Sequence, residues 1–327
     1  MANTALNGAK KAKQDEFYTR LVDIEKEMNA YIDYDKDVFR GKTILLPCDD
    51  PTKSKFTHFF ATNFHHLGIK KLISTCYAGK EGDKGKKLCI TANNVDTDGV
   101  VDFNPQNFEW LEGNGDFRSE EITNLRNEAD MVITNPPFSL FREFVTWLKE
   151  GNVDFSVIGN INAVTYREVF PLIKENNAWI GTKKMTVDGL FTVPKDIEQD
   201  MLDNSKPGGR YRIVDGKVLG RAATIWFTTL QHGKRHEPLE LHTMKDNRDN
   251  NTQLKKKKHV YDTYDNYDAI EVPLVNAIPS DYYGPMGVPI SFLDKYCPEQ
   301  FYIVDTKNTP VLGGEKIYKR IIIRRRT

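Results

Sequence analysis

Up to about residue 180, short apolar runs alternate with stretches of helical periodicity, and this alternation constrains the fold most strongly. The apolar runs, which have the length of buried strands, lie at residues 42–49, 70–77, 130–135 and 155–160. Helical patterns follow two of them, KFTHFFATNFHHLG (55–68) and SLFREFVTWLKEGN (139–152). Strands separated by helices predict βα units around a mostly parallel sheet, which is an α/β fold.

Further elements complete an expected first domain at residues 1–235. They are a hairpin of LCITAN (88–93) and GVVDF (99–103), a helix at 166–177 kinked at Pro171, a strand at 178–183, and one continuous strand at 219–230 that closes the sheet. After residue 235 the chain is first polar and then rich in proline. This composition predicts a second, irregular module at residues 236–327.

Composition and residue spacing indicate where in the cell the protein is expected and whether it is expected to bind a metal. No run approaches the roughly 18 apolar residues of a membrane span, and the polar start lacks the apolar core of a signal peptide, so we expect a cytoplasmic protein with no membrane partner. The four cysteines form no CxxC pair and are expected to be buried apolar side chains. His232 and His236 lack a spaced thiol or carboxylate partner, so no metal is expected.

Charge is distributed unevenly along the chain. The 46 basic residues equal the 46 acidic ones, yet from residue 206 onward 21 Lys and Arg stand against 14 Asp and Glu. Such an asymmetry points to a segment that faces nucleic acid. The basic residues that we expect to contact DNA are Lys255, Lys256, Lys257, Lys258, Arg320, Arg324, Arg325 and Arg326. Solvated tails without a ligand are the alternative that charge alone leaves open.

The strand at 130–135 runs directly into NPPF, which is Asn135, Pro136, Pro137 and Phe138. Ligands of open parallel sheets bind beyond the carboxyl ends of the strands, so we expect this turn on the binding rim. Two consecutive prolines have no N–H and fix their own φ, which gives a rigid turn whose carbonyls stay available as acceptors. The alternative is an ordinary proline turn whose phenylalanine returns to the core.

Such a turn suits a planar molecule that carries an amino group, and adenine fits. Two carbonyl oxygens, from Asn135 and Pro136, can accept both N–H hydrogens while the ring stacks on Phe138. The amine lone pair is delocalised into the ring, so acceptors that pull on both hydrogens favour the tetrahedral nitrogen needed for attack. They act as positive charge develops on nitrogen, which stabilises the transition state without prior deprotonation.

NPPF resembles the [DNS]PP[YFW] motif of amino-group methyltransferases, and further segments occur in the order of that class. DEFYTR (15–20) resembles the segment that covers the methionine end of the cofactor, and GNGDF (113–117) the segment around its adenine. With CDDP (48–51) and the basic end KIYKRIIIRRR, the chain most resembles the EcoRI-type adenine-specific methyltransferase family over nearly its whole length. The resemblance implies a Rossmann-like, S-adenosylmethionine-dependent methyltransferase fold with a C-terminal target-recognition region.

The resemblance also implies a set of cofactor contacts, which are Tyr18, Thr19, Cys48, Asp49, Asp50, Asp116 and Phe117. The chain departs from the wider class in the loop after the first strand, where LLPCDDPTKSKF (45–56) has no glycine in place of an FxGxG-type loop. Glycines there let the backbone approach the ligand. The EcoRI type shares the CDDP variant, in which we expect a carboxylate to face the sulfonium or the amino group of the cofactor.

The expected function is site-specific methylation of adenine N6 in double-stranded DNA, by direct transfer from S-adenosylmethionine to a flipped-out base. A restriction–modification or orphan modification role and a monomeric protein are expected. Two alternatives stay open. One is methylation of an RNA base or of a protein glutamine, and the other is a non-catalytic DNA-binding protein whose cofactor site has degenerated.

Overall fold

The computed structural model describes residues 18–79, 82–94 and 108–326. The chain forms two compact units and passes between them three times. Unit 1 comprises Met1–Ile161 and Val187–Gln231, and unit 2 comprises Asn162–Thr186 and His232–Thr327. The segment 162–186, which was expected in the first domain, therefore packs with the C-terminal part of the chain.

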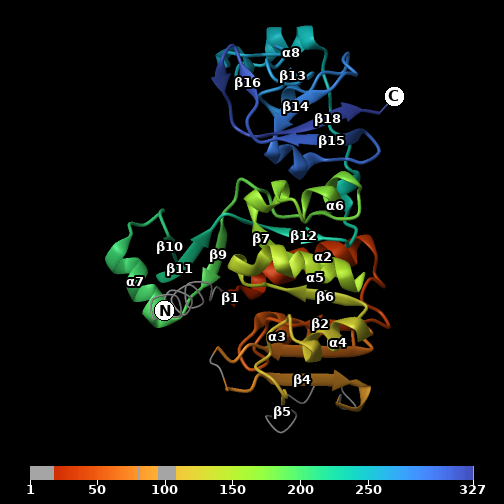
Figure 1. Cartoon of the computed structure of the whole chain (residues 1–327), viewed down its shortest axis with the longest axis vertical. Coiled ribbons are helices and arrows are strands. Elements are labelled where there is room, and N and C mark those ends of the chain that lie inside the picture. The colour runs from red at the N-terminus through yellow and green to blue at the C-terminus, as the bar shows by residue number, and fades with distance from the viewer. Residues whose placement is uncertain (1–17, 80–81, 95–107, 327) are drawn as a thin grey trace. The chain divides into compact units, whose positions relative to one another are not determined.

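Unit 1 is built on a large sheet with parallel strands at its centre (Figure 1). In order across the sheet its strands are β5 (Phe108–Trp110), β4 (Lys86–Thr91), β3 (Lys71–Cys76), β2 (Thr43–Leu46), β6 (Met131–Thr134), β7 (Asp154–Asn160) and β12 (Thr224–Thr228). The pairs β3–β2, β2–β6 and β6–β7 are parallel, and the others are antiparallel. The expected α/β fold is confirmed, while the strand expected at 99–103 lies outside the described residues.

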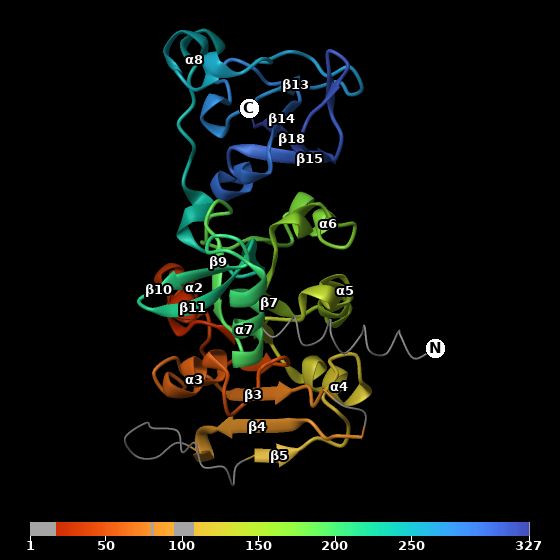
Figure 2. The same cartoon turned by 90° about the vertical axis from the view of Figure 1, so that its left-hand side faces the viewer.

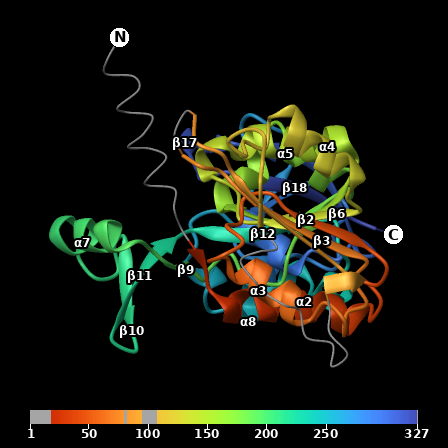
Figure 3. The same cartoon turned by 90° about the horizontal axis from the view of Figure 1, so that it is seen from below.

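Helices cover both faces of this sheet (Figures 2 and 3). α2 (Leu21–Tyr34) and α3 (Lys55–Thr62) lie on one face, and α4 (Glu120–Glu128) and α5 (Phe141–Gly151) lie on the other. Because both faces are covered, every residue of β2 (TILL) and β6 (MVIT) is buried. This double burial explains why both strands lack the polar–apolar alternation of a half-exposed strand.

A second, antiparallel sheet extends unit 1. Its strands are, in order, β1 (Tyr18–Thr19), β9 (Gly189–Thr192), β11 (Lys217–Ala222) and β10 (Tyr211–Val214), and α7 (Lys195–Asn204) lies between β9 and β10 in the chain. Figure 3 shows β10, β11 and α7 projecting from the large sheet. The expectation of one strand at 219–230 is wrong. β11 pairs with β9 and β12 pairs with β7, so the apolar run changes sheets at Ala223.

Unit 2 consists of short elements. They are η4 (Ile161–Thr165), α6 (Phe170–Lys174), β8 (Trp179–Ile180), η5 (Gly233–His236), α8 (Met244–Asn250), η6 (Leu254–Lys256), η7 (Val275–Ala277), η8 (Ile290–Lys295) and the hairpin of β16 (Val311–Leu312) and β17 (Glu315–Lys316). The helix expected at 166–177 is shorter than its pattern. Pro171 occupies the first turn of α6 and does not kink a longer helix, since a proline in the first turn interrupts no hydrogen bond.

A four-stranded sheet organises the C-terminal part of unit 2. Its order is β13 (Ile270–Glu271), β14 (Met286–Pro289), β18 (Arg320–Arg325) and β15 (Phe301–Lys307). β18 pairs with both β14 and β15, and its three isoleucines, 321–323, are fully buried. This region is therefore more regular than its prolines suggested, because the stretch RIIIRR is an internal strand.

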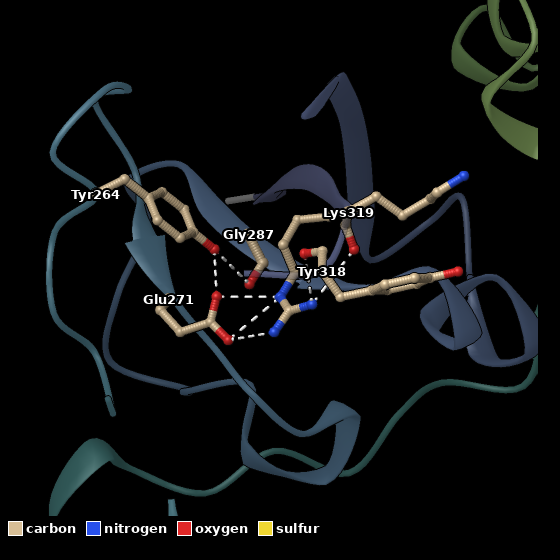
Figure 4. Close-up of polar contacts among 6 residues, drawn as sticks. Tyr264, Glu271, Gly287, Tyr318 and Lys319 are labelled. Atoms are coloured by element: carbon tan, nitrogen blue, oxygen red, sulfur yellow. Dashed lines mark hydrogen bonds and ion pairs between the residues drawn. The ribbon is translucent and has the colours of Figure 1, made fainter. Parts of the chain in front are cut away.

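A buried ion pair fixes the start of β18 (Figure 4). The carboxylate of Glu271, a residue only 2% exposed, accepts hydrogen bonds from Arg320 Nη2 at 2.7 Å and from Nε at 3.0 Å. Tyr264 donates its hydroxyl to the same carboxylate. Burial raises the pKa of Tyr264, and the charge of Glu271 raises it further, so this hydroxyl keeps its proton. A Cβ at Gly287 would collide with that hydroxyl, so the cluster needs glycine there.

Replacing Arg320 by methionine is expected to destabilise unit 2, because the Glu271 carboxylate then stays buried without its countercharge. Loss of one partner of a buried ion pair costs about 3–5 kcal/mol. Urea denaturation would measure the loss, with Arg324→Met, at an exposed position of the same strand, as the control. Equal denaturation midpoints for the two variants would contradict the structural role of the pair.

Candidate active site

Asn135 to Phe138 lie at the exit of β6, on the rim where the parallel strands β3, β2, β6 and β7 end. Pro136 is buried, whereas Asn135, Pro137 and Phe138 are partly buried. The N–H of Leu140 donates to the carbonyl of Pro137 at 3.0 Å, which closes the turn into η3 (Phe138–Leu140). The Pro137 carbonyl is thus engaged within the turn itself.

The ring of Phe138 packs against Phe191 of β9, with centroids 6.3 Å apart and planes at 74°. Phe191 is buried and pairs across the small sheet with Thr19 of β1. Thr19 is buried too, and its Oγ1 has no hydrogen-bond partner in the part of the chain that the structure describes. A buried hydroxyl of this kind is one that a ligand can satisfy. Residues 15–17 of the DEFYTR segment lie outside the described residues.

A network of buried side chains connects the end of β2 to the residue before Asn135. Asp49 is only 6% exposed. Thr134, the last residue of β6, donates its hydroxyl to Asp49 Oδ2 at 2.5 Å, and Ser54 donates to Oδ1 at 2.6 Å. The hydroxyl of Ser74 in β3 donates to the backbone carbonyl of Asp49 at 2.7 Å. Asp49 therefore holds together the ends of three adjacent parallel strands.

The surroundings of Asp49 change its acidity and that of its neighbour. Burial raises the pKa of Asp49 to about 6, although the hydrogen bonds from Ser54 and Thr134 oppose the rise. Burial, followed by the charge of Asp49, also raises the pKa of Cys48. The Cys48 thiol is therefore neutral near pH 7 and is not a nucleophile.

Asp50 is placed differently from Asp49. Its Oδ1 accepts from the N–H of Thr52 at 2.9 Å and from the Thr52 hydroxyl at 2.7 Å, and its side chain is 25% exposed. The two adjacent carboxylates thus have separate environments, one inside the rim and one at its surface. Side chains of adjacent residues on an extended chain point in opposite directions, so these two carboxyl groups are poorly placed to work as an acid and base pair.

The GNGDF segment lies beside the end of β3. Gly115 has a φ of +80°, and a Cβ at this position would collide with the Cys76 carbonyl, so the close approach requires glycine. Asp116 accepts from Arg118 Nε at 3.0 Å and from Nη2 at 2.6 Å, and these bonds lower the pKa of Asp116. Asp116 is therefore ionised at neutral pH, and it retains lone pairs for one further donor.

Phe117 was expected to pack on the cofactor adenine, but it is part of the core. It is 4% exposed, and its ring lies edge-on to Phe144 at 4.9 Å and to Trp147 at 5.6 Å, both in α5. Its contact with the cofactor stays a prediction. An aromatic residue beside a functional loop can face either the ligand or the core, and the sequence does not distinguish the two.

Comparison with known proteins identifies the family of the chain. The family model described as adenine-specific methyltransferase EcoRI matches residues 5–326. The chain belongs to this family. It is 37% identical to type II methyltransferase M.EcoRI of Escherichia coli, over 98% of this chain and 96% of that protein. The resemblance seen in the sequence is thereby confirmed.

Two further relatives come from mycoplasmas. Type II methyltransferase M.MgeORF184P of Mycoplasma genitalium is 38% identical, and M.MpnI of Mycoplasma pneumoniae is 35% identical. Each alignment covers 93% of this chain and 86% of the relative. No solved structure matches the chain.

Three residues that contact the rim residues were not predicted from the sequence. Thr134 and Ser54 were not singled out, although both donate to the buried carboxylate of Asp49. The one available signal was the position of Thr134 directly before Asn135. Phe191 was also missed, since its contact with Phe138 joins residues far apart in the chain.

The lysines expected to bind DNA are accessible. Lys255, Lys256, Lys257 and Lys258 are all exposed at η6 and just after it. Lys258 also pairs with Glu315 at 2.6 Å, which is a surface ion pair of small stabilising effect. Their exposure leaves them able to meet a polyanion.

The C-terminal arginines differ from one another. Arg324 is exposed. The guanidinium of Arg325 lies 4.6 Å from the ring centre of Tyr283, and that of Arg326 lies 3.7 Å from the ring centre of Tyr302. Arg320 is bound inside unit 2 by the Glu271 carboxylate, so its expected contact with phosphate is replaced by a structural role.

No cluster of three His, Cys, Asp or Glu side chains that could hold a metal ion occurs among the described residues. His232 Nε2 lies 3.0 Å from the Ile180 carbonyl, and His236 Nδ1 lies 2.8 Å from Glu299. The two histidines thus have separate partners. In the same described part of the chain, every helix is too short or too polar to cross a membrane.

Asp49 is expected to make stability depend on pH. Its pKa is about 6 in the folded chain and about 3.9 in an unfolded one, so stability falls as pH rises through this window. Asp49→Asn removes this loss. Its free energy of unfolding should match that of the wild type at pH 4 and exceed it at pH 7 by about 3 kcal/mol.

Urea denaturation at the two pH values would measure the difference between Asp49→Asn and the wild type. Asp50→Asn is the matched control, since Asp50 is adjacent but partly exposed. A difference for Asp49→Asn that stays constant with pH would contradict the buried, proton-retaining environment of Asp49.

Proposed function

We propose that the protein is a site-specific DNA adenine N6-methyltransferase in a restriction–modification or orphan modification role, acting as a cytoplasmic monomer. As a member of the EcoRI family it uses S-adenosylmethionine as methyl donor. One observation carries the site assignment. The NPPF turn begins one residue after Thr134, whose hydroxyl binds the buried carboxylate of Asp49.

The two units have separate roles in this proposal. Unit 1 is the Rossmann-like methyltransferase fold, and the rim where β3, β2 and β6 end is its ligand site, as in other open parallel sheets. Residues 236–327 recognise the target, and the segment 162–186 belongs with them in unit 2. The basic excess of the C-terminal part supports this division.

The rim residues fit a cofactor that carries a cationic sulfonium. The carboxyl groups of Asp49 and Asp50 follow β2, and Thr19 offers a buried hydroxyl that lacks a partner in the described chain. We assign the amino acid part of the cofactor to Tyr18, Thr19 and the residues 48–50, and its adenine amine to Asp116. When bound, S-adenosylmethionine supplies an electrophilic methyl group.

Asn135 and the carbonyl of Pro136 accept the two N–H hydrogens of the target adenine amine. Positive charge develops on this nitrogen as it attacks, which strengthens both hydrogen bonds in the transition state. The hydroxyl of Thr134 holds the strand end, so the Asn135 side chain starts from a fixed backbone. The proton leaves the nitrogen after transfer, and no general base is required.

Phe138 receives the flipped base on its ring. Flipping costs a few kcal/mol, and stacking on an aromatic side chain returns about 1–3 kcal/mol. Phe191 supports the Phe138 ring from beside it. The ring is therefore held in place before the base arrives.

Phosphates of the duplex are held by exposed cations. These are Lys255, Lys256, Lys257, Lys258 and Arg324, together with the partly buried Arg325 and Arg326. Such contacts give affinity that falls with salt and carry no sequence information.

The function is tested by sequencing modified bases in genomic DNA from cells that express the protein. We expect N6-methyladenine at one short sequence, and none in cells that express Asn135→Ala. Removal of one acceptor that acts in the transition state should slow transfer by about 100-fold to 1,000-fold, while cofactor binding measured by calorimetry is retained. Asn204→Ala, at the exposed end of α7, is the control. Nearly full turnover of Asn135→Ala would refute the role of Asn135.

Two substitutions that differ in side-chain size and aromaticity test the stacking role of Phe138. Phe138→Ala should weaken capture of the flipped base by about 5-fold to 150-fold, the equivalent of one base–aromatic stack. Phe138→Trp should be tolerated better, since it keeps a flat ring. Emission of 2-aminopurine at the target position reports unstacking of the base. Equal losses for both variants would count against stacking.

A further inference from the structure

Unit 2 contains a cavity of about 260 Å³ that the proposed methyl transfer does not use. Most of its lining comes from β8 and the loop after it at 181–186, from η5 and from η8. All the residues that line it belong to unit 2, so the cavity lies within one compact unit. Sites for small molecules commonly have volumes of about 300–1,000 Å³. The unit 2 cavity lies just below this range, which limits it to a small ligand.

One part of the lining is aromatic and apolar. Trp179, Leu293 and Tyr296 line the cavity, and each is less than a tenth exposed. The guanidinium of Arg235, a residue only 3% exposed, lies 3.7 Å from the centre of the Trp179 ring. A buried positive charge therefore lies beside the aromatic part of the lining. Apolar walls with a few polar groups are typical of sites for a flat organic ligand.

The accessible part of the lining is basic. The charged residues of the cavity, four cations and two anions, are Lys184, Lys234, Arg235, Lys295, Glu237 and Asp294. The three lysines among them are exposed. His232 also lines the cavity, and burial lowers the pKa of this histidine, so its ring is neutral near pH 7. An excess of cations in an accessible cavity attracts an anionic ligand.

Two of the charged side chains are held in place by the backbone. Lys234 Nζ donates to the carbonyl of Thr182 at 2.8 Å, and an ammonium has three N–H donors in all. The two oxygens of Asp294 accept the N–H of Met185 at 3.0 and 3.1 Å. Burial raises the pKa of Asp294, while the N–H of Met185 and the charges of nearby lysines oppose the rise. A carboxylate has about four lone-pair sites, so Asp294 can accept from a ligand as well.

We propose that the unit 2 cavity binds one nucleotide, whose phosphate lies among the lysines and whose base donates an amino group to Asp294. The nucleotide is either one that has left the stack of a DNA strand or a free monophosphate, and both present the same groups. No residue of this cavity belongs to the set assigned to the cofactor or to the target adenine. The inference thus adds a second nucleotide site to the proposed function.

Asp294 gives the cavity a preference among bases. A carboxylate accepts from an amino group such as N4 of cytosine, whereas thymine presents a carbonyl oxygen and a methyl group in that place. Adenine and guanine also carry an amino group. We therefore expect thymine to be the base that the cavity binds most weakly.

The test is calorimetric titration of the whole chain with each of the four deoxynucleoside monophosphates, in excess S-adenosylmethionine so that the cofactor site is filled. The monophosphates of adenine, cytosine and guanine should bind about tenfold to a hundredfold more tightly than that of thymine, the effect of one hydrogen bond to a charged group. Asp294→Asn should remove this preference, because an amide both donates and accepts. Lys184→Ala should weaken the binding of all four by about tenfold, since one ammonium–phosphate contact is lost.

Lys245→Ala, at an exposed position of α8 outside the cavity, is the matched control and should leave every affinity unchanged. The preference against thymine is measured on the wild type, so it does not depend on the folding of any variant. Absence of binding at millimolar concentration, equal affinity for all four bases, or equal affinity for inorganic phosphate alone would overturn the inference. Full affinity in a folded Lys184→Ala would overturn it too.

Competition with a single-stranded oligonucleotide distinguishes the two sources of the nucleotide. Displacement of the bound monophosphate indicates that the cavity takes a nucleotide of a DNA strand, and its retention indicates a free nucleotide. The titration does not depend on methyl transfer. Its failure would therefore leave the proposed function standing, and a chain that binds nucleotides in this cavity without methylating DNA would refute the proposed function alone.

Discussion

The hydrogen bond from Thr134 to Asp49 is the contact on which the rim of the candidate active site depends. It joins the end of β6 to the loop after β2, and Ser74 extends the connection to β3. Hydrogen bonds to a carboxylate are strong in a dry interior. The related loop of the wider methyltransferase class approaches its ligand through glycines, which are absent here. In this protein the buried side chain of Asp49 organises the loop. The geometry of the loop therefore depends on one carboxylate and on the hydroxyls of Thr134 and Ser54.

Each of the two units contains a buried carboxylate that organises the end of a strand. In unit 1 a buried carboxylate binds a hydroxyl one residue before Asn135, and in unit 2 another buried carboxylate binds the guanidinium of Arg320 at the start of β18. In each case the acid fixes one end of a strand through the side chain that it binds. Desolvation makes the burial of each carboxylate unfavourable. This penalty explains why each one accepts hydrogen bonds from several donors.

Local patterns made the central features predictable. The stretch MVITNPPF (131–138) predicts both a buried strand and a rigid turn, because the information lies within eight adjacent residues. The partners of that turn were not predictable in the same way. Thr134 and Asp49 are 85 residues apart, so their contact depends on strand order. The directions of Phe117 and Arg320 likewise depend on what packs beside them, and an apolar run such as 219–230 does not reveal that its halves pair with different strands.

The repeated passage of the chain between the units has an evolutionary consequence. A module can be exchanged between genes as one contiguous segment only if that segment contains all the parts that fold together. Here 25 residues that precede the last part of the first unit fold with the C-terminal portion. Recombination between genes near residue 235 would separate these two segments. Each would then have to pack against a segment from a different protein. New specificities in such an architecture would therefore arise by point substitution within the existing scaffold more readily than by recombination.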